Sequence, residues 1–295
     1  MWIALALLSA AGSAATAFSL KRAMSWGGPI ASTILLRASA GVILLTAVLI
    51  LGPAPVDSPA YLRAVAIALP FELIGTLGWA MALRSGELSL VQPLFGLLPV
   101  VVTLSGAVVF GERPTPAALA GVALVAAGIY TLGVNRARGP LAPFKALASH
   151  PAGRWAGLSV LAWSVTSVVH KLGIAAVGPM SWGVTLAFGS AFGFLLLIPF
   201  LPESLRVVAI QVPGARRHWS RWAALGGGLF ALQQVGLQFA LREAPVSYVI
   251  PLTSTSLVFA VLVGAAFLGE RAALRQRLGA ATLVATGAAL VALYG

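Results

Sequence analysis

One stretch of this chain occurs twice, and the second copy follows the first at a constant distance. Residues 82–94 and 240–252 share Ala-Leu-Arg and then Ser, Val, Pro and Leu at the same spacing. Gly111-Glu112-Arg113 likewise returns as Gly269-Glu270-Arg271, and both pairs of copies are separated by 158 residues. An internal repeat that joins long apolar segments predicts a duplicated bundle of membrane-spanning helices.

Composition supports a membrane protein. Of the 295 residues, 59% are hydrophobic and only 9% are charged, and the mean hydropathy is +0.97. A soluble domain carries about 25% charged residues, so most of this apolar surface must face lipid. The net charge is +12, and the basic residues that carry it lie between the apolar runs. There we expect them to contact membrane lipids and not nucleic acid. The chain has no Cys, which excludes disulfides and thiolate metal sites.

Ten apolar segments are long enough to cross a bilayer, for which about 20 residues are needed. They are uniformly apolar, whereas the strands of a membrane barrel alternate. We therefore predict an all-α polytopic membrane protein with ten transmembrane helices in two inverted five-helix repeats. The expected halves are residues 1–134 and 154–295, joined by a basic loop at 135–153. The segments are roughly 2–20, 29–51, 61–84, 88–110, 115–134, 154–174, 180–201, 222–242, 246–268 and 274–294.

The distribution of basic residues predicts an orientation. Of the 19 lysines and arginines, 14 fall in loops on one side of the predicted bundle and 4 on the other, while Arg37 lies within the second helix. Loops rich in Lys and Arg usually stay in the cytoplasm. The charge count thus predicts a protein of the inner (cytoplasmic) membrane of the cell with both termini outside.

The sequence also resembles a known family. Each half ends with an apolar helix, Gly-Glu-Arg and an Ala- and Gly-rich helix, and Arg37 follows Gly28-Pro29 in the second helix. This pattern resembles the EamA-type branch of the drug/metabolite transporter (DMT) superfamily over nearly the whole chain. The resemblance implies a secondary transporter, such as a metabolite exporter, which has no cofactor and is not an enzyme.

The chain departs from that family in three ways. Pro99 precedes Glu112 as the family pattern expects, but the corresponding position in the second half is Leu257. Family members usually keep their termini inside, in conflict with the charge count. Small multidrug members use a Glu in the first helix, and this first helix contains no acid, so their proton–drug mechanism does not carry over.

Glu72 is the acid that lies deepest in an apolar run. Helical spacing places it on one face with Thr76 and Trp79. A carboxylate beside an indole can receive an ammonium group, and burial favours the neutral carboxyl, which suits proton coupling. The alternative is that Glu72 pairs with Arg37 and only stiffens the bundle.

Several polar and proline positions are further candidates for the wall of a transport cavity. Gln234 is the repeat equivalent of Thr76, and Gln238 lies one turn further along. Pro93 and Pro251 are equivalent positions where a proline interrupts a helix, a feature that often marks a substrate site. Side chains near them complete the set: Gln92, Tyr248 and Ser254. The alternative for all of these residues is helix packing, with hydroxyls bonding to freed carbonyls.

Lys171 and Arg37 are candidate gate residues. For Lys171 the alternative is an anchor that reaches to the membrane surface from the end of the sixth helix. Glu112, Arg113, Glu270 and Arg271 precede a helix, and we expect them to support its N-terminus.

Three functions fit these features to different degrees. The first is a secondary transporter of small polar metabolites such as amino acids or amines, working by alternating access without ATP and with a proton as candidate coupling ion. The second is a lipid or lysolipid translocator, which the basic loops would suit. The third, an intramembrane enzyme, lacks a recognisable nucleophile–base or metal motif in the sequence. We expect a monomer or a weak dimer that contacts a small-molecule substrate and membrane lipids.

Overall fold

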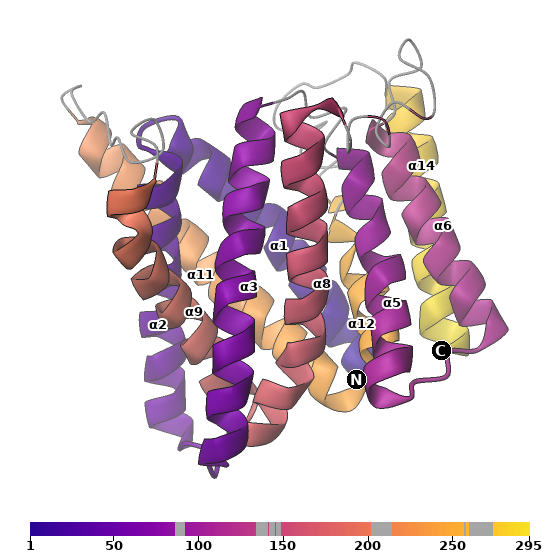
Figure 1. Ribbon diagram of the computed structural model, residues 1–295, viewed down its shortest axis with the longest axis horizontal. Coiled ribbons are helices and arrows are strands. Elements are labelled where there is room, and N and C mark those ends of the chain that lie inside the picture. The colour runs from indigo at the N-terminus through magenta and orange to yellow at the C-terminus, as the bar shows by residue number, and fades with distance from the viewer. Residues whose placement is uncertain are drawn as a thin grey trace.

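The structure is a computed structural model, and it describes residues 1–85, 92–133, 141, 145, 149–201, 214–256, 258–259 and 274–295. These residues form a bundle of helices and no strand (Figure 1). The predicted all-helical class is thereby confirmed. The first half contributes α1 (Trp2–Met24), α2 (Pro29–Leu51), α3 (Ser58–Ser85), the short 3₁₀ helix η1 (Gln92–Gly96), α5 (Leu97–Phe110) and α6 (Pro116–Gly133). The second half contributes α8 (Pro151–Val177), α9 (Pro179–Leu197), the 3₁₀ turn η3 (Ile198–Phe200), α11 (Ala215–Glu243), α12 (Val246–Thr253) and α14 (Leu274–Tyr294).

The helices follow the apolar segments of the sequence closely. In the described part of the chain, seven helices are long and apolar enough to cross a membrane, and shorter apolar helices span Leu94–Phe110 and Pro116–Thr131. Several boundaries differ from the prediction by three residues or more: α1 continues to Met24, α3 begins already at Ser58, α8 spans Pro151–Val177, α9 ends at Leu197 and α11 begins at Ala215. Of the predicted ninth segment, α12 covers the beginning, and residues 260–268 lie outside the described residues.

Gly-Pro pairs start the same helix in each half. Pro29 opens α2 after Gly28, and Pro179 opens α9 after Gly178. Proline suits the first position of a helix because its nitrogen has no hydrogen to leave unpaired. Gly178 has a φ of 78°, a left-handed conformation that glycine adopts without steric cost. The chain can therefore leave α8 and enter α9 without an intervening loop.

Close helix contacts depend on glycine. A Cβ atom added to Gly121 on α6 would lie 2.6 Å from the backbone oxygen of Gly287 on α14, and one added to Gly236 on α11 would lie 2.6 Å from that of Leu5 on α1. Gly189 and Gly193 of α9 instead make room for the side chains of Leu69 and Leu73 of α3. Since lipid gives helices little hydrophobic reason to associate, such close backbone approach holds a membrane bundle together.

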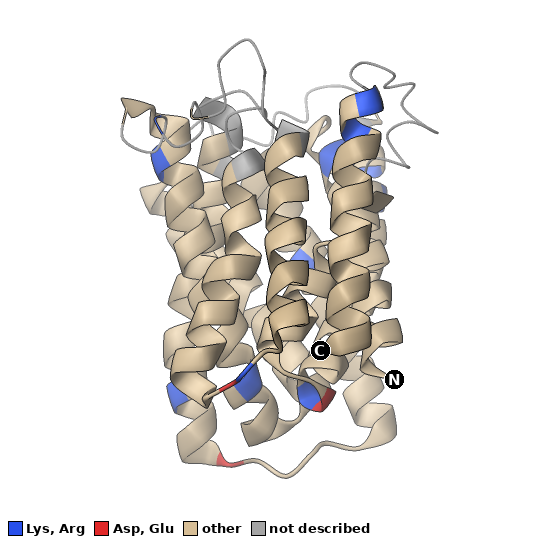
Figure 2. Ribbon diagram, turned by 90° about the vertical axis from the view of Figure 1, so that its right-hand side faces the viewer, with Lys and Arg blue, Asp and Glu red and all other residues tan. Residues whose placement is uncertain are grey.

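The helices pack in a similar way in the two halves. When each helix is replaced by its counterpart in the other half, the main contacting pairs are again contacting pairs. The extensive interfaces join α3 to α8 and α1 to α11, and further ones join α2 to α9 and α6 to α14. Both termini lie at the same end of the bundle, which we call the terminal end (Figure 1). Most of the lysines and arginines visible in Figure 2 lie near the two ends of the bundle. The outward surface is apolar, as shown by Leu49 and Val108, whose side chains are 73% and 85% exposed.

Candidate functional site

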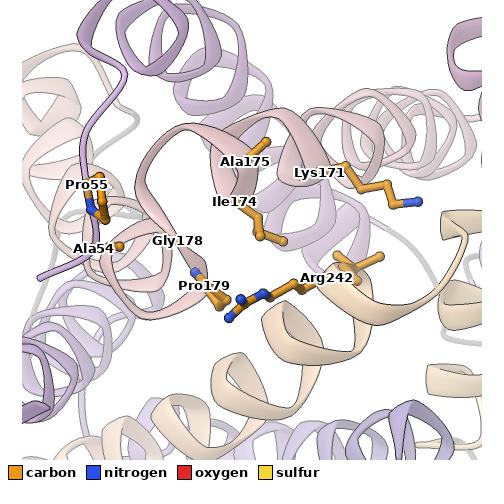
Figure 3. A pocket seen from close by; sticks show the side chains of 9 residues that line it. Ala54, Pro55, Lys171, Ile174, Ala175, Gly178, Pro179 and Arg242 are labelled. Carbon is orange, nitrogen blue, oxygen red and sulfur yellow. The ribbon is translucent and has the colours of Figure 1, made fainter.

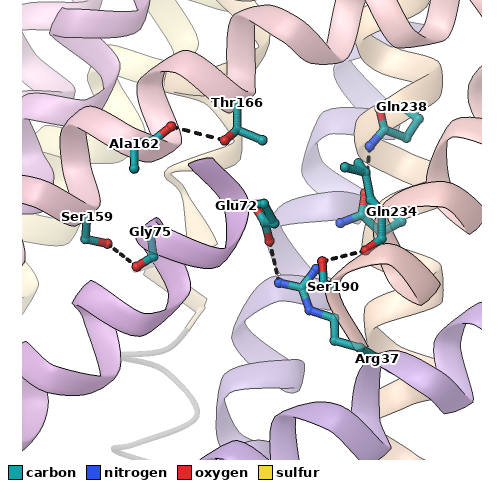
Figure 4. Close-up of polar contacts among 10 residues, drawn as sticks. Arg37, Glu72, Gly75, Ser159, Ala162, Thr166, Ser190, Gln234 and Gln238 are labelled. Carbon is teal, nitrogen blue, oxygen red and sulfur yellow. Dashed lines mark hydrogen bonds and ion pairs between the residues drawn. The ribbon is translucent and has the colours of Figure 1, made fainter. Parts of the chain in front are cut away.

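A buried ion pair lies between α2 and α3. The Arg37 guanidinium donates from Nη2 to Glu72 Oε1 at 2.6 Å, and both side chains are only 11% exposed (Figure 4). The pairing that sequence analysis gave as the alternative for Glu72 is therefore present. A charge pair in a low-dielectric interior is costly to separate, because removal of one partner leaves the other charge unpaired, at about 3–5 kcal/mol.

Phe230 of α11 forms the other side of this pair. The Arg37 guanidinium carbon lies 4.2 Å from the centre of the Phe230 ring, within the range of a cation–π contact. Phe230 is also the residue of the second half that the 158-residue offset places opposite Glu72. Arg37 thus links the two repeat-equivalent positions, one carrying a carboxylate and the other an aromatic ring.

Further polar side chains lie beyond Glu72 on α3 and beyond Phe230 on α11. Thr76 lies one turn beyond Glu72 on α3, and Gln234 and Gln238 follow Phe230 at one-turn intervals on α11. Gln238 donates from Nε2 to Gln234 Oε1 at 2.7 Å. All three side chains are buried, yet Thr76 Oγ1 and Gln238 Oε1 have no hydrogen-bond partner in the described structure. Buried polar atoms without a partner are rare, and these two oxygens can each accept a further hydrogen bond.

Trp79 lies next to this polar group. It is half-buried, and its ring centre lies 6.5 Å from that of Trp163 on α8. It packs in the same apolar cluster as Phe230. Together, Arg37, Glu72, Thr76, Gln234 and Gln238 form the central polar group, with Trp79 and Phe230 as aromatic neighbours.

The two proline candidates lie in short helical segments. Pro93 falls within the 3₁₀ helix η1, and α12 ends at Thr253, two residues after Pro251. Ser254 Oγ donates to the Ile250 carbonyl at 3.1 Å, so this hydroxyl bonds to its own helix. The side chains of Gln92 and Pro93 lie outside the described residues.

Tyr248 lies away from the central polar group. Its ring stacks on Trp2 at the start of α1, with the ring centres 6.5 Å apart. A Cβ atom added to the chain end, Gly295, would lie 3.2 Å from the same ring. Tyr248 is therefore placed at the terminal end, where it joins α12 to α1.

A second polar group, centred on Glu112, joins the two halves at the terminal end. Glu112 Oε1 accepts from the Val246 N–H at 2.9 Å, and Oε2 accepts from the Ser247 N–H at 3.0 Å and from Ser247 Oγ at 2.6 Å. Lys171 Nζ of α8 lies 3.2 Å from Oε1. We call this set of contacts the Glu112 cap.

This arrangement corrects the role expected for Glu112. The next helix in sequence, α6, is capped instead by Thr115, whose Oγ1 accepts from the Ala118 N–H. Glu112 caps α12 of the other half, because the residue before α12 is Pro245, which has no side-chain oxygen to offer. Gly111, with a φ of 65°, makes the turn after α5. Arg113 is exposed, and Glu270 and Arg271 lie outside the described residues.

Electrostatics favour the ionised form of Glu112. Burial raises the pKa of its carboxyl group, but hydrogen bonds from the Ser247 side chain, from the N–H groups of Ser247 and Val246, and from Lys171 outweigh burial. The net result is a pKa below the ordinary value of 4.5. A carboxylate at a helix N-terminus also interacts favourably with the helix dipole.

Lys171 lies within α8 and not at its end as predicted, since α8 continues for another six residues to Val177. The adjacent His170 is buried, and its Nδ1 accepts from Trp182 Nε1 at 2.9 Å. Lys171 also lines a cleft of about 480 Å³ between α8, the start of α9 and the end of α11 (Figure 3). Sequence analysis did not find this cleft, because its lining comes from three separate parts of the chain.

The comparisons with known proteins agree with this architecture. The EamA-like transporter family matches residues 1–134 and 153–293, which together make up most of the chain. The chain belongs to the EamA-like transporter family. The predicted resemblance is thereby confirmed, and this EamA-like transporter is an integral membrane protein.

A search of solved structures supports the fold independently. A crystal structure, titled only as that of a protein, has a TM-score of 0.74 and covers 99% of this chain and 99% of its own. The two sequences are 18% identical, so the likeness shows the fold alone. No curated protein matches the chain.

Proposed function

We propose that this EamA-like transporter moves small zwitterionic metabolites, such as neutral amino acids, across the membrane. The observation that carries the proposal is the buried Arg37–Glu72 pair, with the unpartnered Thr76 hydroxyl one turn along α3 and the unpartnered Gln238 oxygen further along α11. A zwitterion can exchange partners with this pair, with its carboxylate on Arg37 and its ammonium group on Glu72. Both charges of the protein and both charges of the substrate then stay paired.

The net charge of the pair argues against singly charged substrates. An amine would bind the Glu72 carboxylate and leave the Arg37 guanidinium without a partner. A simple carboxylate would bind Arg37 and leave Glu72 without a partner. Unpaired charges at this depth cost several kcal/mol each. A zwitterion avoids that cost, and the unpartnered Thr76 hydroxyl and Gln238 amide oxygen offer hydrogen bonds to its ammonium group or to a polar side chain.

We further propose that transport proceeds by alternating access of two inverted five-helix halves. The exchange-related helix pairs and the repeated sequence support this arrangement. In the described state, the Glu112 cap joins the halves at the terminal end, and we infer that it closes that end. Opening would separate Glu112 from the N-terminus of α12. Lys171, which pairs with Glu112 in the closed state, is the proposed gate residue.

Transport in proteoliposomes tests the proposal. Glu72→Gln and Arg37→Gln should each abolish uptake of neutral amino acids, because each leaves one substrate charge unpaired. Ser164→Ala serves as the control, since that buried hydroxyl bonds only to the Val160 carbonyl of its own helix. If either single variant does not fold, the exchanged pair Arg37→Glu with Glu72→Arg keeps the charge balance and should fold.

The same variant tests coupling to a proton. If the Glu72 carboxyl carries the coupled proton, Glu72→Gln loses transport driven by a pH gradient. A Glu72→Gln protein with unchanged rate, affinity and pH profile would show that Glu72 is only a structural residue and would refute the proposed site.

A further inference from the structure

The cleft at the terminal end is lined by two cationic side chains and by no acidic one. Lys171 enters from α8 and Arg242 from the last turn of α11. The remaining lining is apolar or backbone and includes Pro55, Ile174, Leu241 and the start of α9 at Gly178–Pro179. With a volume of about 480 Å³, the cleft has room for a small organic anion or a lipid headgroup.

Arg242 lies where positive charge is already present. Its guanidinium extends toward Pro179, the first residue of α9 (Figure 3). That helix has no side-chain cap and no acidic residue in its first turn, so the positive end of its dipole is uncompensated. Arg242 itself makes no hydrogen bond or ion pair with the described residues. Neither of two acids at this end pairs with the Arg242 guanidinium. The Asp57 carboxylate accepts from the Ala60 N–H at the start of α3, and Glu243 is exposed.

Lys171, which contacts Glu112 and lies 5.5 Å from the centre of the Phe110 ring, can reach a second anion without breaking the rest of the Glu112 cap. Its contact with Glu112, at 3.2 Å, is the longest of the four that the carboxylate makes. The other three contacts already occupy both oxygens of Glu112, so the carboxylate keeps its partners when Lys171 leaves. The Lys171 side chain is 26% exposed and carries its charge on a flexible stem of four carbons.

We propose that this cleft binds a phosphate group, held by Arg242, Lys171 and the N-terminus of α9. Arginine and helix N-termini are the usual phosphate ligands in proteins. Basic pockets between transmembrane helices bind the phosphates of lipid headgroups, and the apolar lining here suits the adjoining glycerol. The phosphate therefore belongs either to a lipid headgroup or to a soluble phosphate compound. Bound phosphate and Glu112 compete for Lys171.

Thermal unfolding of the purified protein tests this site without measuring transport. In a neutral detergent, inorganic phosphate should raise the melting temperature of the wild type in a saturable way, since a ligand of the folded state stabilises it. Arg242→Gln should weaken phosphate binding by about tenfold or more, as expected for the loss of a charge-assisted hydrogen bond. Arg113→Gln, which removes an exposed cation at the same end but outside the cleft, should leave phosphate binding unchanged.

Glu112→Gln provides the readout that distinguishes binding from general stability. It frees Lys171 and should therefore strengthen phosphate binding while it weakens the fold. Nanodiscs of phosphatidylcholine, whose phosphate charge is balanced by its own choline cation, with and without the anionic lipid phosphatidylglycerol distinguish an anionic lipid headgroup from a soluble phosphate compound. A lipid ligand raises the melting temperature only with phosphatidylglycerol and in an Arg242-dependent way, whereas a soluble ligand gives the phosphate response in both. The proposal is overturned if neither phosphate nor phosphatidylglycerol stabilises the wild type, or if Arg113→Gln weakens binding as much as Arg242→Gln.

Discussion

Replacement of Glu112 by Gln should destabilise this transporter although Glu112 lies in a loop. The change removes the negative charge at the N-terminus of α12 and replaces one of the two accepting oxygens by an NH₂ group, at a cost of about 1 kcal/mol. The charge-assisted bond from Ser247 Oγ contributes about 1 kcal/mol more. The partly exposed Lys171 adds at most about 1 kcal/mol. We therefore expect a loss of about 2–3 kcal/mol in the free energy of unfolding.

Reversible unfolding in mixed detergent micelles measures this loss. Glu243→Gln is the matched control, because it makes the same chemical change to an exposed acid at the same end of the bundle. It should change the free energy of unfolding by less than about 0.5 kcal/mol. Lys171→Gln should lose no more than about 1 kcal/mol, because the other contacts of Glu112 remain.

The pH dependence of the loss gives a second check. Because folding lowers the pKa of Glu112 below 4.5, its carboxylate stabilises the fold fully above that pH. This contribution disappears as the pH falls through the lower pKa of the folded state. The difference between the wild type and Glu112→Gln should shrink accordingly in acid. A Glu112→Gln protein as stable as Glu243→Gln, or a difference that is the same at pH 7 and in acid, would refute the cap.

Three further outcomes are expected. Gly121→Ala should cost about 1–3 kcal/mol of stability, measured by unfolding in detergent, because its Cβ would press on α14. As a control, the Cβ of Gly279→Ala meets nothing within 4 Å, so that variant should be neutral or stabilising. Pro251→Ala should reduce transport in proteoliposomes without loss of monodispersity, and unchanged transport would make Pro251 a packing residue. In intact cells, a membrane-impermeant thiol reagent should label Cys at Val56 but not Cys at Lys145, and the reverse pattern would place the termini inside.

Hydropathy was sufficient to locate the helices. In the described residues, the long apolar runs form helices, because lipid leaves the backbone no other way to satisfy its hydrogen bonds at that depth. The boundaries were less accurate where a helix continues past the apolar run. The charged first turns of α11, with Arg216 and Arg217, are an example, since hydropathy does not register helix that extends into the headgroup layer.

Contacts within the site were harder to predict. Helical spacing grouped Glu72 with Thr76, and the scarcity of deep charges made Arg37 the natural partner of Glu72, as found. Spacing gave no indication that Glu112 would cap a helix that begins at Val246, because the two positions meet only through the packing of the two halves. In a membrane bundle both the core and the lipid face are apolar, so the pattern along a helix does not reveal which neighbour it meets.

The requirement for both charges on the substrate is tested most directly by three compounds that share one side chain. Leucine, its decarboxylated amine and its deaminated acid can be compared by thermal unfolding of the purified wild type and of Glu72→Gln. The exchange of partners at Arg37 and Glu72 predicts that leucine, or another neutral amino acid in the same series, stabilises the wild type, whereas its amine and its acid do not. The Glu72→Gln variant should lose the response to leucine, whereas its unpaired Arg37 should now favour the acid. Stabilisation by the amine or the acid equal to that by the zwitterion would contradict the proposed site.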